Sequence, residues 1–481
     1  MATFHLVNFG CRASQADGYS LKRQLCEAGL EESPTADASH YAVLNTCTVT
    51  AGADAEVRQI IRRIHRANPA CRILVTGCYA QRAPEEITKL PGVAWVVGNS
   101  HKHKVAELLS DSSRHAADIV LKSTTPGLDE NPGATSGLIQ ICDSSSSEAG
   151  VNGDTRKDAE DSGSKVLVGE ISEEFHFAPV FSDDRTRPTL KIQDGCDARC
   201  SFCIIPAVRG ASRSLDPATV IAEVRELCNQ GYKEIVLSGI NLGGYGRDLA
   251  PRSMFLELIE RILAETSIAR LRISSIEPMD VSAELIRLVA TEPRMARHFH
   301  VPLQSGCDRI LRQMNRRYWT RHYAERILAI HEAIPACGIG ADVMVGFPGE
   351  TDDDHHASLR FIESLPLTYL HIFPYSSRPG TPAAARKDHV NGRIARERSN
   401  DIRGVINAKR RKFLESLVGS ELAALTLDES EDGARVALAT NYVKVLLPES
   451  EIPPNTLTGV RVGRAHGGCL YGYAETSHAA A

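Results

Sequence analysis

Short apolar runs alternate with helical patterns along most of this chain, and this alternation restricts its fold more than any other feature. Four such runs lie near the start, at 4–8, 41–45, 72–76 and 93–97. Between the second and third runs, a helical spacing places four aliphatic residues on one face, Val57, Ile60, Ile61 and Ile64. Alternation of this kind is typical of a parallel sheet covered by helices. Residues 1–120 are therefore predicted to form an open parallel α/β sheet domain.

A second alternating series begins at Pro188. Its six candidate strands are 189–193, 234–238, 270–276, 298–304, 341–347 and 369–375. Six strand-helix units fall short of the eight of a full barrel, so we predict a partial (βα)6 barrel over residues 187–415. In such a fold the chemistry gathers where the strands end.

Two further segments differ in character. Residues 121–186 contain 13 Asp or Glu against 5 Lys or Arg and a run of serines at 144–147, which indicates an acidic flexible linker. Local docking is expected near Val166–Val168 and Phe175–Phe181. Residues 416–478 contain short alternating runs broken by Gly, Asn and Pro, which indicates a small antiparallel β-barrel. The predicted class is α/β.

Composition narrows the class of protein further. With 42% hydrophobic and 24% charged residues, the chain is not fibrous or wholly disordered. No apolar run approaches the roughly 18 residues of a membrane helix, and the start lacks a secretory pattern, so we expect a cytoplasmic protein with no membrane partner. The 13 cysteines are an odd number in a chain too large to need disulfides, which makes metal ligation the hypothesis to test.

Three cysteines follow the first strand of the second series, in the octapeptide Cys196-Asp-Ala-Arg-Cys200-Ser-Phe-Cys203. Three thiolates at this spacing can hold three corners of a four-iron cluster, whereas a structural zinc site needs a fourth ligand nearby. The fourth iron is then open to a small molecule. A partial zinc site or a set of buried thiols is the alternative.

A second triplet is dispersed in the first domain. Cys11, Cys47 and Cys78 each stand two or three residues beyond the first, second and third apolar runs. The carboxyl ends of parallel strands lie side by side, so these thiols can converge on a second cluster with an open iron. Taken singly, each cysteine is more simply a small buried hydrophobic residue, and that alternative stays open.

The first triplet, with Phe202 before its last cysteine, resembles the radical S-adenosylmethionine superfamily. The second triplet lies in the contexts Asn8-Phe-Gly-Cys11, Asn45-Thr-Cys47 and Thr76-Gly-Cys78. Together they resemble the methylthiotransferase family, in which such a domain precedes a radical S-adenosylmethionine domain and a C-terminal TRAM domain. The resemblance covers all of the chain except the linker.

This resemblance implies cofactors and roles. Cys196, Cys200 and Cys203 would hold a [4Fe-4S] cluster that binds S-adenosylmethionine and, with one electron, splits it to a 5′-deoxyadenosyl radical. The other triplet would hold an auxiliary [4Fe-4S] cluster that carries the methylthio group. The family reaction uses two molecules of S-adenosylmethionine and a one-electron donor of flavodoxin or ferredoxin type.

The family has three branches, which modify threonylcarbamoyladenosine in tRNA, isopentenyladenosine in tRNA, or an aspartate of a ribosomal protein. Three segments resemble the first branch, Val236–Gly246, Arg272–Pro278 and His300–Gly306. We expect that substrate, with isopentenyladenosine as the second choice. A redox-sensing iron-sulfur RNA-binding protein without turnover is a hypothesis of another class.

Polar residues near strand ends are candidates for binding S-adenosylmethionine. Ser238 and Gly239 would admit its methionine end, and three carboxyl or amide side chains and a serine could bind its ammonium or ribose, namely Ser275, Glu277, Gln304 and Asp342. Capping of the following helix is the alternative for each. The sequence assigns no catalytic side chain.

For tRNA, the strongest local feature is the stretch 393–412, with 8 Lys or Arg against 2 acids. A solvated helix face is the alternative. Arg209 and Arg213, just after the cysteine loop, are expected closer to the substrate. Residues 418–481 hold 8 acids against 4 Lys or Arg, which departs from the basic surface expected of an RNA-binding barrel.

Overall fold

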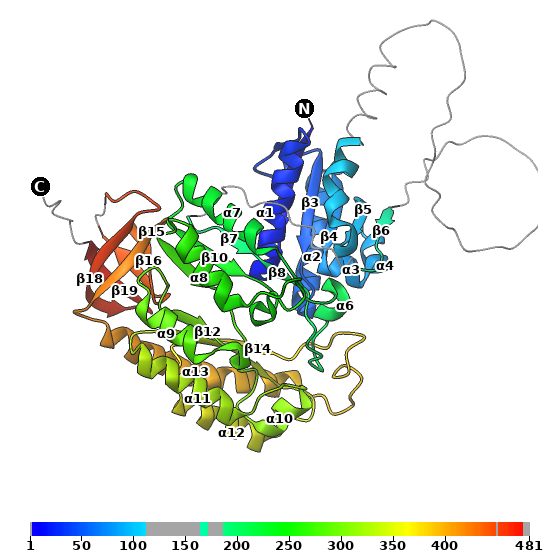
Figure 1. The fold of residues 1–481 in the computed structure, drawn as a ribbon. Coiled ribbons are helices and arrows are strands. Elements are labelled where there is room, and N and C mark those ends of the chain that lie inside the picture. The colour runs from blue at the N-terminus through cyan, green and yellow to red at the C-terminus, as the bar shows by residue number, and fades with distance from the viewer. Residues whose placement is uncertain (1, 112–163, 172–185, 449–450, 475–481) are drawn as a thin grey trace, which may run out of the picture.

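The computed structural model describes residues 2–111, 164–171, 186–448 and 451–474. A blue N-terminal sheet, a green-to-orange central unit and a red C-terminal barrel pack against one another (Figure 1). Most of the predicted acidic linker, 121–163 and 172–185, lies outside the described residues. No helix in the described part of the chain is long and apolar enough to span a bilayer.

The N-terminal unit is a six-stranded sheet in the order β2-β1-β3-β4-β5-β6, and all of its pairings are parallel. Its strands are β1 (Thr3–Asn8), β2 (Glu31–Glu32), β3 (Tyr41–Thr46), β4 (Arg72–Gly77), β5 (Val93–Gly98) and β6 (Lys165–Leu167). The connecting helices are α1 (Arg12–Glu27), α2 (Ala51–Ala67), α3 (Cys78–Arg82) and α4 (Pro84–Thr88). The predicted open parallel sheet is confirmed.

Helices cover both faces of this sheet. Val57, Ile61 and Ile64 of α2 are buried against one face. Leu21 and Leu25 of α1 are buried against the other. The helical spacing of apolar residues in the sequence therefore reflects real packing, and burial of these faces stabilises the unit.

The edge strand β6 belongs to the segment predicted as linker. Lys165–Leu167 pairs with Trp95–Val97 of β5, and Ser164 donates a 2.7 Å hydrogen bond to the carbonyl of Val93. The chain thus returns to the N-terminal sheet, near the Val166 where the sequence indicated docking, before it enters the central unit.

The central unit contains the six predicted strands, but they form two three-stranded parallel sheets. One has the order β11-β10-β7 and the other β12-β13-β14. The strands are β7 (Thr189–Lys191), β10 (Glu234–Ser238), β11 (Arg270–Ile273), β12 (His298–His300), β13 (Gly338–Val345) and β14 (Tyr369–Pro374). An isolated parallel bridge between Leu271 and Met295 joins the halves, so the predicted partial barrel is present with a break in its ladder.

Helices cover the outside of this partial barrel. They are α7 (Pro217–Asn229), α8 (Phe255–Glu265), α9 (Ala283–Thr291), α10 (Asp308–Gln313), α11 (Thr320–Ala333) and α12 (Asp352–Ser364). Alternate residues of β13, Ile339, Ala341, Val343 and Val345, lie in the core that these helices cover. Because neighbouring strand residues point to opposite faces, Asp342 lies on the inner face of the barrel.

The cysteine loop of the central unit is enclosed by a short antiparallel ribbon. Strand β8 (Gln193–Asp194) precedes the loop, α6 (Ile205–Arg209) follows it, and β9 (Arg213–Ser214) pairs back with β8. Gly195 has φ +72, and a Cβ there would lie 1.8 Å from the carbonyl oxygen of Ala211. Only glycine allows the two sides of the ribbon to approach this closely.

A long helix, α13 (Gly392–Ser416), leads to the C-terminal barrel. The barrel is closed in the order β15-β16-β17-β19-β18. Its strands are β15 (Glu421–Glu431), β16 (Ala434–Ala439), β17 (Lys444–Leu447), β18 (Leu457–His466) and β19 (Cys469–Ala474). The predicted small barrel is confirmed, with one difference: β17 and β19 pair in parallel, because this pairing closes the barrel.

A buried charge cluster fixes the C-terminal barrel to the central unit. Glu234 is fully buried and forms ion pairs with Arg270, with Arg272 at 2.7 Å and with Arg187 at 3.4 Å. Arg272 also donates to the carbonyl of Thr440 at 3.1 Å. Burial alone would raise the pKa of Glu234, but Arg272 and the other guanidinium groups hold it well below its ordinary value. The carboxylate thus orients the two arginines that bind the barrel backbone.

Candidate functional site

The dispersed cysteines of the N-terminal sheet follow three strands that are direct neighbours. Cys47 and Cys78 come immediately after β3 and β4, and Cys11 lies three residues after β1. The thiols are close enough that Cys11 and Cys78 both act electrostatically on Cys47. The structure therefore brings this triplet together at the carboxyl edge of the sheet.

Gly10 makes the close approach of Cys11 and Cys47 possible. It has φ +91, and a Cβ on it would lie 2.3 Å from the Cβ and 2.7 Å from the Sγ of Cys47. A side chain there would occupy the position of the thiol. The glycine of the Asn-Phe-Gly-Cys segment thus has a steric role at the site.

The triplet of Cys196, Cys200 and Cys203 is held in a loop, the cysteine loop, whose backbone is hydrogen-bonded at several points. Within the loop, the N–H of Cys203 donates to the carbonyl of Cys200 at 3.1 Å. Ser201 of the loop donates through its hydroxyl to a residue outside it, the carbonyl of Gln313, at 2.7 Å. The Cys196 and Cys200 thiols act electrostatically on Cys203, so these three sulfurs also form a group.

The protonation and spacing of the thiols fit a polynuclear cluster. Burial raises the pKa of Cys47 to about 11 and that of Cys203 to about 12, so strong Lewis acids are needed to bind both as thiolates near neutral pH. A single tetrahedral zinc ion would bring its sulfur ligands to about 3.8 Å from one another. Among the described residues, the one group of three ligand atoms all within 4.8 Å contains no cysteine. Neither cysteine triplet forms such a compact group in the described part of the chain, and three thiols without a fourth ligand are the donor set expected of a three-cornered cluster site.

Helix α6 links the two triplets. It begins two residues after Cys203, and its Val208 packs with Ile204 against Cys78 of the other triplet. Asn99 connects the same elements, since its Nδ2 donates to the Sγ of Cys78 at 3.5 Å and to the carbonyl of Val208 at 2.8 Å. The two cysteine sites are thus neighbours across one turn of helix.

Arg209, the last residue of α6, is buried between the two units. Its Nη2 lies 2.8 Å from Asp17 of α1, and its Nη1 lies 2.9 Å from Asp194 of β8. Burial alone would lower its pKa, but Asp194, the Cys78 thiol, Asp17 and the Cys11 thiol together raise the pKa of Arg209 well above its ordinary value. Its Nε is buried without a hydrogen-bond partner among the described residues. A buried N–H donor beside two thiols suits an anionic cluster at this position.

Two lysines complete this buried ion network. Lys191 pairs with Asp17 and, at 2.8 Å, with Asp194. Lys102 lies 2.9 Å from Asp17. Asp17 of the N-terminal unit is therefore bound by cations from both units, which fixes the relative position of the two cysteine sites.

A salt bridge connects the cysteine loop to the inside of the barrel. The guanidinium of Arg316 donates to the Sγ of Cys200 at 3.3 Å and pairs with Glu277. Burial raises the pKa of Glu277, although Arg316 opposes this effect. Glu277, a sequence candidate, therefore lies beside the cysteine loop.

The other candidates are distributed over both half-sheets. Ser238 is buried at the end of β10, and a Cβ on the next residue, Gly239, would lie 2.9 Å from Oε1 of Gln193. Ser275 lies two residues after β11. None of these three has a hydrogen bond to the cysteine loop within the described ranges.

Gln304 and Asp342 lie in the second half-sheet. The backbone N–H of Gln304 donates to the carbonyl of Asp342 at 2.8 Å, and its Oε1 is buried with no hydrogen-bond partner in the described part of the chain. The Asp342 carboxylate binds His300 at 3.1 Å and His371 at 3.2 Å. Neither histidine was predicted as a site residue, because a lone histidine in a strand carries no spacing signal.

The basic stretch 393–412 is the predicted helix, but part of its charge is structural. Arg398 is buried against Glu350 at 2.8 Å, Lys409 donates to the carbonyl of Glu363, and Arg410 donates to that of Gly468. The remaining cations of this stretch are exposed, Arg393, Arg396, Arg403, Arg411 and Lys412.

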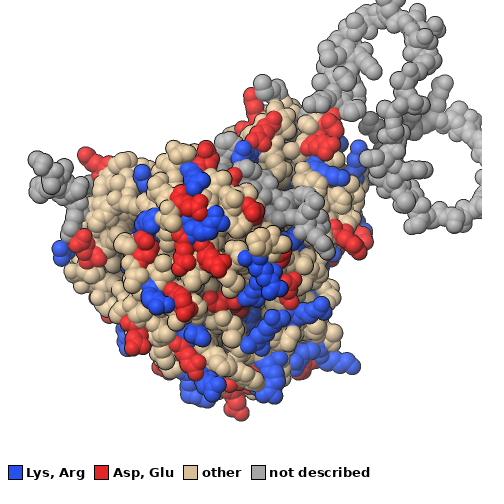
Figure 2. Space-filling model, viewed as in Figure 1, with Lys and Arg blue, Asp and Glu red and all other residues tan. Residues whose placement is uncertain are grey.

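Positive charge is also concentrated near the cysteine loop. Figure 2 shows Lys and Arg gathered at the lower right of this face, over the region of α6 and α10 in Figure 1. Trp319, which follows α10 in the sequence, is 43% exposed. Cζ of Arg312 lies 5.4 Å from the centre of its ring. Arg213 donates to the carbonyl of Arg209 at 2.7 Å and so contacts the end of α6.

Comparison with known proteins agrees with this arrangement. Residues 190–362 match the model of the Radical SAM superfamily, and residues 3–98 match that of a family described as uncharacterized protein family UPF0004. The chain is also similar in fold to the radical S-adenosylmethionine methyltransferase TsrM from Kitasatospora setae, with a TM-score of 0.53 at 17% identity over 80% of this chain and 77% of that one. This likeness concerns the fold alone.

Similar sequences extend over nearly the whole chain. The threonylcarbamoyladenosine tRNA methylthiotransferase MtaB of Aquifex aeolicus is 35% identical, over 91% of this chain and 94% of that protein. The protein of the same name from Bacillus subtilis is 33% identical, over 97% and 94%. The tRNA-2-methylthio-N(6)-dimethylallyladenosine synthase of Pelotomaculum thermopropionicum is 30% identical, over 98% and 99%. With both cysteine triplets in place, this chain belongs to the methylthiotransferase family of radical S-adenosylmethionine enzymes.

Proposed function

We propose that this protein converts N6-threonylcarbamoyladenosine beside the tRNA anticodon to its 2-methylthio derivative. The observation that supports the proposal is the junction of the two cysteine sites through α6, which would allow two cluster-bound reactants to meet one substrate. The relatives named for this reaction, at 35% and 33% identity over nearly the full chain, support the choice of substrate.

The cofactors of the family are two [4Fe-4S] clusters and S-adenosylmethionine. In our proposal Cys196, Cys200 and Cys203 ligate one cluster, and Cys11, Cys47 and Cys78 ligate the other. When bound, these groups supply a 5′-deoxyadenosyl radical and the sulfur and methyl that are transferred. S-adenosylmethionine would be bound by Ser238, Gly239, Ser275 and Glu277 on the β10 and β11 side of the barrel, with Gln304 reaching it from the second half-sheet.

The side chains of the protein position these groups. Arg316 and Glu277 form a rigid pair beside Cys200, so a carboxylate of fixed orientation is available to the ammonium group of S-adenosylmethionine. Val208 of α6 and the preceding Ile204 pack against Cys78 and would keep water from that side of the thiol. Reactants held in this way need little reorganisation before reaction.

Recognition of tRNA would use the basic surface beside the cysteine loop. Arg199, Arg312 and Arg317 are exposed there, and their charges can neutralise phosphates. Trp319 offers a flat face on which an unstacked base can lie. The acidic C-terminal barrel has no comparable concentration of cations in the sequence, so we assign it a smaller share of RNA binding.

A tRNA substrate implies a cytoplasmic enzyme and an external one-electron donor, for which a flavodoxin or ferredoxin is proposed. The decisive measurement is mass spectrometry of tRNA nucleosides from cells with and without the gene. Loss of 2-methylthio-threonylcarbamoyladenosine in the deleted strain, and its return on complementation, is expected. An unchanged level would refute the proposed substrate.

A second candidate substrate is dimethylallyladenosine, because the Pelotomaculum relative is named for it and matches 98% of this chain. In the same nucleoside analysis, loss of the 2-methylthio dimethylallyl nucleoside alone would favour it. Purified protein reduced anaerobically with S-adenosylmethionine should also release 5′-deoxyadenosine and methionine. A non-catalytic iron-sulfur RNA-binding protein would release neither.

A further inference from the structure

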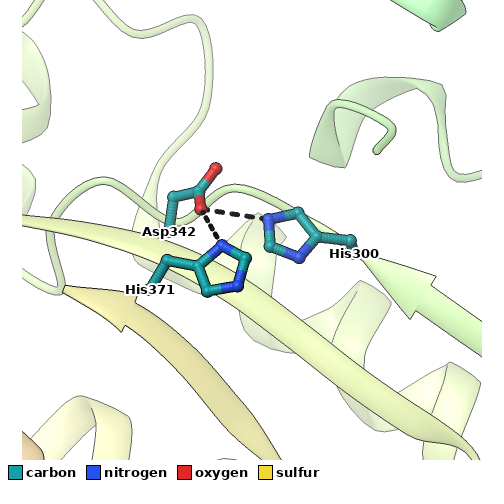
Figure 3. A group of neighbouring side chains, drawn as sticks. All are labelled: His300, Asp342 and His371. Carbon is teal, nitrogen blue, oxygen red and sulfur yellow. Dashed lines mark ion pairs between the residues drawn. The ribbon is translucent and has the colours of Figure 1, made fainter. Parts of the chain in front are cut away.

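A polar cluster lies on the inner face of the second half-sheet. Figure 3 shows His300, Asp342 and His371 directed toward one another from three neighbouring strands. Oδ1 of Asp342 lies 3.1 Å from Nε2 of His300 and 3.2 Å from Nδ1 of His371. In the strand register, Asp342 is the direct partner of His371. The cluster is therefore fixed by the sheet.

The cluster is charged and strongly oriented. Burial alone would raise the pKa of Asp342, but hydrogen bonds from His300 and His371 hold it well below its ordinary value. Nδ1 of His300 lies 3.0 Å from the buried hydroxyl of Tyr369, which fixes the plane of the imidazole ring. These hydrogen bonds fix the orientation of His300 and Asp342, and His371 is bonded to this fixed pair.

Exposure increases across the cluster. The side chain of His300 is 8% exposed, that of Asp342 is 25% and that of His371 is 64%. No partner for Nε2 of His371 is present among the described residues. A ligand would therefore meet His371 first and then Asp342.

The cluster is connected to the radical chemistry. Asp342 acts electrostatically on Glu277, and Glu277 pairs with Arg316, which contacts Cys200. The candidates Ser238, Gly239, Ser275 and Glu277 belong to the β10 and β11 side of the barrel, whereas this cluster belongs to the β12, β13 and β14 side. S-adenosylmethionine and the target nucleoside, which would share the barrel, would then bind to different halves of it.

Its chemistry discriminates between the two nucleoside substituents named for the relatives. A threonylcarbamoyl group has N–H and O–H donors and a carboxylate, which can satisfy an ionised carboxylate and an imidazole. A dimethylallyl group has none, so it would remove water from these charged groups without replacing the lost hydrogen bonds. A site built for hydrogen bonds rejects such an analogue strongly.

We propose that His300, Asp342 and His371 form the subsite for the threonylcarbamoyl substituent of the target adenosine. Asp342 accepts a hydrogen bond from a carbamoyl N–H, Nε2 of His371 accepts one from the threonyl hydroxyl because its Nδ1 donates to Asp342, and His300 positions Asp342. The inference rests on the proposed function and assigns to Asp342 a role different from contact with S-adenosylmethionine.

The test measures binding of three anticodon stem-loops to the cluster-loaded protein under anaerobic conditions. The stem-loops differ only at the target base, which is adenosine, threonylcarbamoyladenosine or dimethylallyladenosine. We expect the wild type to bind the threonylcarbamoyl form at least about tenfold more tightly than the unmodified form, a difference of about 1.4 kcal/mol. His371→Phe and Asp342→Asn should lose this preference, with binding of the unmodified form changed less than about twofold.

Two controls separate this effect from misfolding. His389 is an exposed histidine in the segment after β14, and His389→Phe should keep the preference of the wild type. The release of 5′-deoxyadenosine without RNA should stay at the wild-type rate in His389→Phe. In His371→Phe, the KM for the threonylcarbamoyl substrate should rise by a larger factor than kcat falls.

The outcomes distinguish this inference from the proposed function. If the wild type prefers the threonylcarbamoyl form and both variants keep that preference, the subsite assignment is overturned and the function stands. If the wild type prefers the dimethylallyl form, both are overturned. A divalent ion present at one per chain in the wild type and lost in Asp342→Asn, with RNA preference unchanged, would show a metal site in place of the subsite.

Discussion

Nη2 of Arg209 lies 2.8 Å from Oδ2 of Asp17, and this buried ion pair joins the helix that follows one cysteine triplet to the helix that follows Cys11 of the other. Arg209 is 2% exposed and Asp17 is 5% exposed. A charge pair at such depth is costly to break on one side, because the remaining charge has no water to replace its partner. The relative position of the two cysteine sites therefore depends on this contact.

Removal of the Arg209 charge should weaken both stability and cluster geometry. Arg209→Met removes one of the two cations that Asp17 and Asp194 share and leaves Lys191 as the other. We expect a loss of about 3–5 kcal/mol in the free energy of unfolding. Chemical denaturation of the anaerobic protein measures this loss. Arg209→Lys, which keeps the charge, should recover more than half of it. An unchanged midpoint in Arg209→Met would contradict the structural role.

Gly10→Ala should abolish the N-terminal cluster selectively. The new Cβ would lie 2.3 Å from the Cβ of Cys47, so the thiol must move. We expect iron per chain to fall from about eight to about four atoms while release of 5′-deoxyadenosine persists. Gly29→Ala is the matched control, because Gly29 also has positive φ, +85, but has open space around its Cβ position. It should keep the full iron content.

The two cysteine triplets should have separable functions. Cys200→Ala removes one ligand of the proposed radical cluster, so cleavage of S-adenosylmethionine should be lost. Cys47→Ala should leave that cleavage measurable but stop formation of the methylthio product. Anaerobic turnover with product analysis by mass spectrometry checks both. Full product formation by Cys47→Ala would remove the auxiliary-cluster assignment.

Trp319→Ala should weaken tRNA binding by about 1–3 kcal/mol, because an exposed indole can stack on one base. Filter binding or fluorescence anisotropy with the intact tRNA measures the effect. Tyr473→Ala removes another exposed aromatic ring, 68% exposed on the C-terminal barrel, and should have a smaller effect. A larger loss in Tyr473→Ala would transfer the main RNA contact to that barrel.

Glu234→Gln should reduce stability in a pH-dependent way. The pKa of Glu234 is depressed in the folded state, so its ion pairs stabilise the protein fully above the unfolded pKa of about 4.3 and lose this effect as the pH falls further. The difference between wild type and variant should be about 3–5 kcal/mol at pH 7 and should decrease below about pH 4.

The control for this pH dependence is Glu265→Gln. Glu265 pairs with Arg225 at the surface at 3.2 Å, so its replacement should change stability little at any pH. Denaturation curves collected between pH 3 and pH 8 provide the comparison. A Glu234→Gln difference that stays constant with pH would show that the ionised state of Glu234 does not matter.

The sequence predicted the elements because local patterns encode them. The runs before Cys11, Cys47 and Cys78 became β1, β3 and β4, and the proximity of these cysteines followed from the rule that parallel strands end at one edge. The octapeptide 196–203 needed no tertiary information, since its first and last thiols are only seven residues apart. Periodicity and spacing therefore determined the cysteine sites and the fold class.

Contacts between distant segments were decided by the tertiary structure alone. The sequence could not predict that Arg209 pairs with Asp17 or that Arg316 contacts Cys200, because the residues that surround an arginine in the sequence do not show whether it is buried or solvated. The division of the barrel into half-sheets, the parallel pair of β17 and β19, and the meeting of His300, Asp342 and His371 likewise depend on how strands align side by side. The sequence specifies which residues can ligate a metal or form an ion pair. Burial in the folded chain selects their partners, because it excludes water and makes each unpaired charge costly.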